Sequence, residues 1–199
     1  MKDKPLNIIL LGDPAAGKAT QSALLVKKFK LFDFDMGHEL RVLRQTNPKM
    51  KRLLQATYDQ GKVTQTKIVR KILHDKIHRT PREKGILFDG HPKMLGEAKL
   101  AIKWLKQEAR RDPIVIYLSI PLDETVKRMA DRREYFKGKF SRRADDTTQA
   151  LKNRVRYYRK NIADVIGFLS KKYPYRKING LGNVAQVHKR VMQGINELL

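Results

Sequence analysis

The feature that most restricts the possible folds is a glycine-containing loop between an apolar run and a helix-like segment. The apolar run 6–11 leads directly into the loop, and the helical pattern of residues 22–26 follows it. Gly12, Gly17 and Lys18 have the spacing of a phosphate loop, in which backbone N–H groups and the lysine converge on phosphates. The general pattern has Ser or Thr where this chain has Ala19, and a plain strand-to-helix turn is the alternative interpretation.

Composition indicates one compact domain and leaves the meaning of the charge open. A chain of 199 residues can bury a sizeable core, and it contains no cysteine, which fits a reducing cytoplasm. We expect neither a secretory nor a membrane segment, because no apolar run approaches about 20 residues. The formal net charge of +24 fits either a solvated basic surface or a loose attraction to RNA, for which the sequence holds no motif.

Apolar runs alternate with helical patterns along the chain. We predict strands over residues 6–11, 32–34, 86–88, 114–118 and 176–178. We predict helices over residues 17–29, 64–79, 95–110, 122–133, 144–172 and 184–199. This order favours an α/β fold of three layers, with a parallel five-stranded sheet flanked by helices. Two segments interrupt the order: 36–66 as a small insertion with two short helices over 37–61, and 133–143 as a short basic loop.

Five segments match, in order and spacing, the motifs of one known family. They are the loop 12–21, Met36-Gly37-His38-Glu39-Leu40-Arg41, Asp89-Gly90-His91-Pro92-Lys93, Pro121 to Arg132 with Arg128, and Arg143-Ala144-Asp145-Asp146 with Arg154. On these residues the chain resembles the adenylate kinase family of nucleoside monophosphate kinases, and the resemblance runs nearly end to end. It implies that 36–66 binds the acceptor monophosphate and that 133–143 is a short lid without a zinc site.

The resemblance also implies residue roles. It places ATP at Gly12, Asp13, Pro14, Ala15, Ala16, Gly17, Lys18, Ala19, Thr20, Arg128 and Arg132. It places the acceptor at Met36, Gly37, Arg41, Thr64, Gly90, Lys93, Glu97, Arg143 and Arg154. Lys18, Arg128, Arg132, Arg143 and Arg154 would be the catalytic cations. Asp89 would hold Mg²⁺ through water, because Mg²⁺ usually keeps several of its waters. The implied protein is a cytoplasmic monomer that uses Mg²⁺ with ATP and no zinc.

The chemistry explains this choice of residue types. Transfer of a phosphoryl group brings two anionic nucleotides together, so positioned cations that exclude water supply most of the catalysis. Each arginine also has an ordinary alternative as a solvated surface group, and Arg128 can pair with Glu124 at helical spacing. His38 and His91 carry no second ligand pattern that would indicate a metal site.

The departures from the family pattern lie on the acceptor side. Met36 and His38 replace Thr and Asp, and Lys93 replaces an arginine whose planar fork binds phosphate in a bidentate manner. Glu97 stands where the family reads adenine with Gln, and an ionised carboxylate only accepts hydrogen bonds. Three functions therefore remain open: transfer to AMP, transfer to another monophosphate such as GMP, and nucleotide binding with weak turnover and RNA association.

Overall fold

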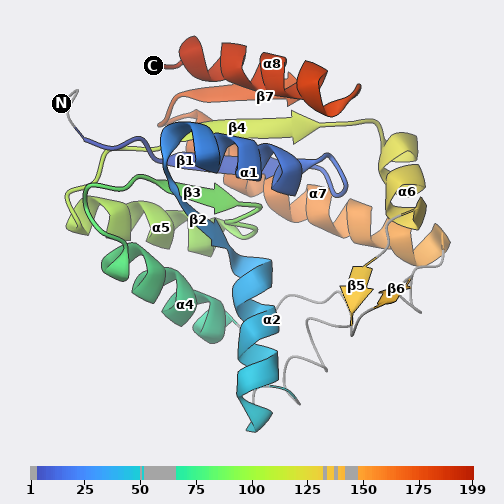
Figure 1. The fold of residues 1–199 in the computed structure, drawn as a ribbon, viewed down its shortest axis with the longest axis horizontal. Coiled ribbons are helices and arrows are strands. Elements are labelled where there is room, and N and C mark those ends of the chain that lie inside the picture. Colours follow the sequence, from blue (N-terminus) through green and yellow to red (C-terminus); the bar gives the residue numbers. More distant parts are fainter. Residues whose placement is uncertain (1–3, 50, 52–65, 132–133, 137–138, 142–147) are drawn as a thin grey trace.

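The computed structural model describes residues 4–49, 51, 66–131, 134–136, 139–141 and 148–199. Its centre is a five-stranded parallel sheet in the spatial order β2-β3-β1-β4-β7 (Figure 1). The strands are β1 (Ile8–Gly12), β2 (Phe32–Asp35), β3 (Ile86–Asp89), β4 (Ile114–Ser119) and β7 (Tyr175–Asn179). The predicted five-stranded parallel sheet is confirmed, with small shifts at the strand ends.

Helices cover both faces of this sheet, which confirms the three-layer arrangement. The described helices are α1 (Lys18–Phe29), α2 (Met36–Thr46), α4 (Thr66–Arg79), α5 (Leu95–Gln107), α6 (Leu122–Asp131), α7 (Thr148–Ser170) and α8 (Val184–Asn196). One core joins the sheet to α1 and α8, and the other joins it to α4, α5 and α7 (Figure 1).

The central strand β1 shows why the sheet strands are continuous apolar runs. Ile8 and Leu10 are fully buried in the core beneath α1 and α8, whereas Ile9 and Leu11 are fully buried in the core on the opposite face. Because helices cover a parallel sheet on both faces, alternation between apolar and polar residues disappears. The same run therefore fixes β1 in the middle of the molecule, immediately before the glycine loop.

The carboxyl edge of the sheet gathers the segments singled out in the sequence. Gly12 ends β1 beside Leu118 of β4, and a Cβ at this glycine would lie 2.5 Å from the Leu118 carbonyl oxygen. Asp35 and Asp89 are register partners at the ends of β2 and β3. In open α/β sheets, ligands bind outside this edge. From the same edge α2 projects away from the sheet (Figure 1).

Several predicted elements differ from the structure, and α7 and α8 end at Ser170 and Asn196, before the predicted residues 172 and 199. The segment 133–143, predicted as a loop, contains the antiparallel strands β5 (Glu134–Phe136) and β6 (Lys139–Ser141). Helix α5 ends at Gln107 and not at residue 110, because Ala109 takes a left-handed backbone with φ 50°. The predicted helical residues 144–147 and most of the insertion after residue 51 lie outside the described residues. Within the described residues, helices long and apolar enough to cross a membrane are absent.

Candidate functional site

The amino end of α1 has the electrostatic character of a phosphate site. Gly17 precedes the helix in a left-handed conformation with φ 88°, and α1 begins at Lys18. The first turn of α1, all of which is described, contains neither Asp nor Glu. The positive end of the helix dipole therefore has no carboxylate in that turn to offset it, and an anion is favoured there.

Lys18 lies between the loop and the Asp89–Lys93 segment. Its Nζ donates hydrogen bonds to the carbonyl oxygens of Gly12 and Asp13, at 2.8 and 2.9 Å. A Cβ built on Gly90, which has φ 62°, would lie 3.4 Å from Cε of Lys18. The structure therefore brings together Lys18 and Gly90, which the sequence assigned to donor and acceptor binding respectively.

Asp89 is a carboxyl group whose protonation is strongly affected by its surroundings. Burial raises its pKa to about 6, and nearby Asp35 and Asp33 add to the rise, while Lys18 and Lys93 oppose it. Burial also raises the pKa of Asp33, although Ser22 donates a hydrogen bond to its Oδ1 at 3.1 Å. Three acidic side chains thus lie near Lys18 and Lys93 at the carboxyl edge, and a divalent cation would offset their negative charge.

Inside the loop, the two alanines differ in backbone conformation. Ala15 has φ 59°, in the left-handed region that favours glycine, so this position is strained. Its methyl group packs against the small apolar cluster of Met129 and Val155. Ala19 and Thr20 lie in the first turn of α1 and are exposed. The methyl contact partly offsets the backbone strain at Ala15.

Asp13 belongs to the loop, but its side chain points into the protein. It is 1% exposed, and its Oδ1 accepts hydrogen bonds from Arg159 Nε at 3.0 Å and from the Tyr117 hydroxyl at 3.1 Å. Its Oδ2 accepts from the N–H of Ile120 at 3.0 Å, and its own N–H donates to Leu118 O at 2.9 Å. The side-chain carboxylate and the backbone N–H of Asp13 therefore both have structural roles, which the sequence pattern did not indicate.

The predicted catalytic arginines are only partly placed. Arg128 lies on α6, where its Nε donates to Glu124 Oε1 at 2.6 Å and its Nη1 to Gly180 O at 3.4 Å. The ordinary pairing with Glu124 is therefore present, beside the end of β7. Arg154 lies in α7, and the structure describes its backbone position alone. Arg132, Arg143 and Thr64 lie outside the described residues.

The predicted acceptor residues at the start of α2 surround Asp35. Its Oδ1 accepts from the Gly37 N–H at 2.7 Å and so caps the helix, and its Oδ2 lies 3.3 Å from Arg41 Nη2. Met36 is 5% exposed and belongs to the core, whereas Lys93 is exposed. Asp35 therefore connects Arg41 to the Asp89 cluster. Asp33 and Asp35 were not among the predicted site residues, because their proximity to Asp89 depends on strand order.

Glu97 has a structural role at the start of α5. Its Oε2 accepts hydrogen bonds from the backbone N–H groups of Lys93 at 2.9 Å and Met94 at 3.2 Å. The side chain is almost fully buried. Burial raises the pKa of Glu97, whereas the two backbone hydrogen bonds favour the ionised form and oppose the rise. His91 Nδ1 lies 3.6 Å from the same oxygen, and burial lowers the pKa of His91 to about 3. An acid in the first turn of a helix is a capping signal, and the sequence held that signal.

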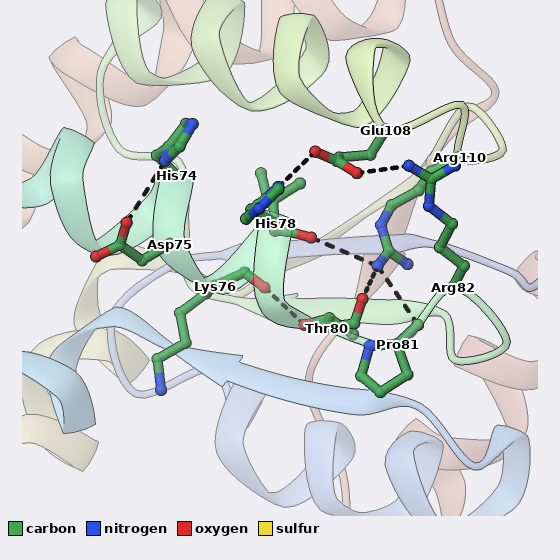
Figure 2. Close-up of polar contacts among 10 residues, drawn as sticks. His74, Asp75, Lys76, His78, Thr80, Pro81, Arg82, Glu108 and Arg110 are labelled. Atoms are coloured by element: carbon green, nitrogen blue, oxygen red, sulfur yellow. Dashed lines mark hydrogen bonds and ion pairs between the residues drawn. The ribbon is translucent and has the colours of Figure 1, made fainter.

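A second polar cluster lies at the opposite, amino edge of the sheet (Figure 2). Glu108 lies 2.8 Å from His78 Nδ1 and 3.0 Å from Arg82 Nη2. The Arg110 guanidinium donates to the carbonyl oxygens of Ile77, Thr80, Pro81 and Lys84. The Ile77 carbonyl lies in the last turn of α4 and the other three follow its end. Carbonyls at a helix end need donors from outside the helix, so the cluster stabilises this terminus.

Comparisons with known proteins agree with this geometry. The family model described as adenylate kinase matches residues 10–173. The chain is 28% identical to an adenylate kinase of Bacteroides thetaiotaomicron and 30% identical to one of Flavobacterium johnsoniae. Each match covers 97% of this chain and 100% of the relative. The family model covers most of the chain, including the phosphate loop at the carboxyl edge and the Asp89–Lys93 segment. The chain therefore belongs to the adenylate kinase family.

Proposed function

We propose that this protein is an adenylate kinase that transfers the terminal phosphoryl group of ATP to AMP, reversibly, giving two ADP. The family to which the chain belongs and its relatives support nucleoside monophosphate kinase activity in general. The observation that carries the proposal is the position of Lys18, which contacts the phosphate loop and lies beside Gly90 and the partly buried Asp89. A cation and a carboxyl group at one sheet edge fit a metal-bound triphosphate.

The donor site follows from the loop and the acidic cluster. Lys18 would exchange its two carbonyl contacts for the outer phosphates of ATP, while N–H groups at the start of α1 hold the others. Carboxylate oxygens are ligands that Mg²⁺ prefers, so Asp89 fits a role in holding the metal, with Asp35 and Asp33 nearby. Bound Mg²⁺ would neutralise charge on the phosphates, and it would keep Asp89 ionised.

The transfer itself needs cations on both nucleotides. Arg128 on α6 and Arg154 on α7 would join Lys18 around the phosphates. Arg132, just before the lid, and Arg143, arriving with the lid, would complete the set. Closure of residues 133–143 over the donor would exclude water and so prevent hydrolysis. Arg41 and Lys93 would bind the acceptor phosphate.

AMP is the acceptor that the position of Glu97 favours. A carboxylate that selected guanine would need its oxygens directed at the two donors on the base. Here Oε2 already accepts two backbone N–H groups at the start of α5. Glu97 is therefore better suited to shaping the acceptor site than to reading a guanine edge.

A coupled assay of ADP formation tests the proposal. Mg-ATP is offered with AMP, GMP, CMP and UMP in turn, to the wild-type protein and to Lys18→Ala. We expect turnover with AMP that Lys18→Ala abolishes and Lys27→Ala preserves, since Lys27 is exposed at the far end of α1. Turnover with GMP in preference to AMP, shifted towards AMP in Glu97→Gln, would contradict the choice of acceptor.

A second candidate is nucleotide binding combined with RNA association, and the basic rows on α4 and α5 favour it. Exposed cations recur at helical spacing on both helices, at Lys67, Arg70, Lys71, Lys99, Lys103 and Lys106. RNA binding that weakens steeply with salt, in a protein that binds ATP without transferring phosphoryl groups, would favour this candidate over the first.

A further inference from the structure

The side-chain network around Asp13 connects three segments that carry proposed catalytic cations. Asp13 lies in the phosphate loop, which leads to Lys18. Ile120 lies two residues before α6, which carries Arg128, and Arg159 lies on α7, five residues after Arg154. Five residues of helix span about 7.5 Å, so Arg154 and Arg159 lie within two helical turns of each other on α7.

Arg159 spans two of these segments by itself. Its Nε donates to Asp13 Oδ1 at 3.0 Å, and its Nη2 donates to the Ile120 carbonyl oxygen at 2.9 Å. Asp13 completes the connection, because its Oδ2 accepts from the Ile120 N–H at 3.0 Å. A planar guanidinium can hold two acceptors in fixed directions at once, which an ammonium group cannot do.

The charge of this pair matters as much as its geometry. Asp13 is a buried carboxylate in a loop suited to binding phosphates, and Arg159 is its ion-pair partner. Without Arg159 the Tyr117 hydroxyl and the Ile120 N–H would still donate to Asp13, but they bring no full positive charge. An unpaired negative charge would then lie beside the triphosphate and repel it. The neighbouring Tyr158 adds a second contact from α7, since Lys18 Nζ lies 6.0 Å from the centre of its ring.

We propose that Arg159 is a positioning residue: through Asp13 and Ile120 it holds the phosphate loop, the start of α6 and α7 in one arrangement, and it neutralises Asp13 for ATP binding. The inference rests on the proposed function, because it concerns the alignment of Lys18, Arg128 and Arg154 for transfer. Asp13 is buried in this ion pair while the Arg159 side chain is 39% exposed. Such a pair is a weak source of stability, and its better-supported use is to select a single geometry.

A double-mutant cycle on Asp13 and Arg159 tests this role by direct titration of ATP and by steady-state kinetics. We expect Arg159→Gln to weaken ATP binding by about tenfold and to lower kcat, because Asp13 is left without its charged partner. Asp13→Ala combined with Arg159→Gln removes both charges and should recover most of the ATP affinity. Arg159→Lys keeps the charge without the fork, so it should retain ATP affinity and still lose kcat.

The matched control is Arg156→Gln, which removes the same charge from an exposed position on the same helix. We expect its ATP affinity and kcat to stay within about twofold of the wild type. An Arg159→Gln protein that unfolds at a lower temperature but binds ATP and turns over like the control would overturn the proposal. Strictly additive effects of the Asp13 and Arg159 substitutions on ATP affinity would also overturn it.

The titration separates this inference from the proposed function. ATP affinity is measured without an acceptor. A wild-type protein that binds ATP but transfers nothing would refute the kinase proposal, and the coupling between Asp13 and Arg159 could still be measured from the ATP affinities. Normal turnover in the wild type, with no coupling between Asp13 and Arg159, would refute the positioning role alone.

Discussion

Replacing Asp89 with Asn should stabilise the ligand-free protein at neutral pH while it damages the metal-binding role. The pKa of Asp89 rises from 3.8 to about 6 on folding, mainly through burial and further through Asp35 and Asp33. A rise of roughly two pKa units corresponds to about 3 kcal/mol at pH values above both pKa values. Asp89→Asn removes the ionisable group, so its free energy of unfolding should exceed that of the wild type by about 2 to 3 kcal/mol at pH 7.

The pH dependence fixes the sign of this effect. Between pH 4 and pH 6 the folded chain keeps a proton on Asp89 that the unfolded chain has already lost. The contribution of Asp89 to stability is therefore fully present below about pH 4 and is lost as the pH rises through about 6. Asp89→Asn should lack this fall, so the two proteins should be most alike in stability near pH 4.

Urea unfolding at a series of pH values from 4 to 8 measures the effect, with Mg²⁺ and nucleotide absent. The exposed carboxyl group of Asp112 supplies the control, and Asp112→Asn should follow the wild-type curve. An Asp89→Asn protein that is no more stable than the wild type at pH 7 would refute the reasoning. A wild-type curve parallel to that of Asp89→Asn from pH 4 to pH 7 would refute it as well.

Five further substitutions test the loop, the start of α1 and the start of α5 by urea unfolding. Gly12→Ala should destabilise by about 3 kcal/mol, because its Cβ would lie 2.5 Å from a backbone oxygen; a loss below about 1 kcal/mol would contradict this. Ala15→Gly should stabilise by up to about 1 kcal/mol by relieving the left-handed backbone, whereas Ala19→Gly, in a helix, should destabilise by a similar amount. Changes of the same sign would refute that argument. Glu97→Ala should cost about 2 kcal/mol by leaving two N–H groups without an acceptor, and Glu97→Gln should cost less than about 1 kcal/mol. Equal losses would contradict the capping role.

The sheet and the phosphate loop were predictable because local sequence determines both. A run such as residues 6–11, apolar at every position, favours a strand buried on two faces, and the loop spacing then indicates the turn into α1. The hairpin of β5 and β6 was missed although Lys137-Gly138 separates two short runs with aromatic residues, which is a turn signal.

The directions of side chains at the site depended on tertiary structure. Asp13 occupies a variable position of the loop, and its burial follows from the neighbouring β4 and α7, which only the fold supplies. Arg159 is one of 44 basic residues, so nothing local distinguishes it. Alignment with the family motif suggested that Glu97 recognises the base of the acceptor. Its place three residues after Met94 also fitted a helix cap.

Phosphorus NMR of ADP mixed with the protein and Mg²⁺ tests the central claim most directly, because one nucleotide serves as both substrates of the reverse reaction. We expect the ADP signals to decline while those of ATP and AMP appear in equal amounts, and Lys18→Ala to leave ADP unchanged. ADP that persists with the wild-type protein, under conditions where ATP binding is measurable, would contradict the assignment of phosphoryl transfer to this site.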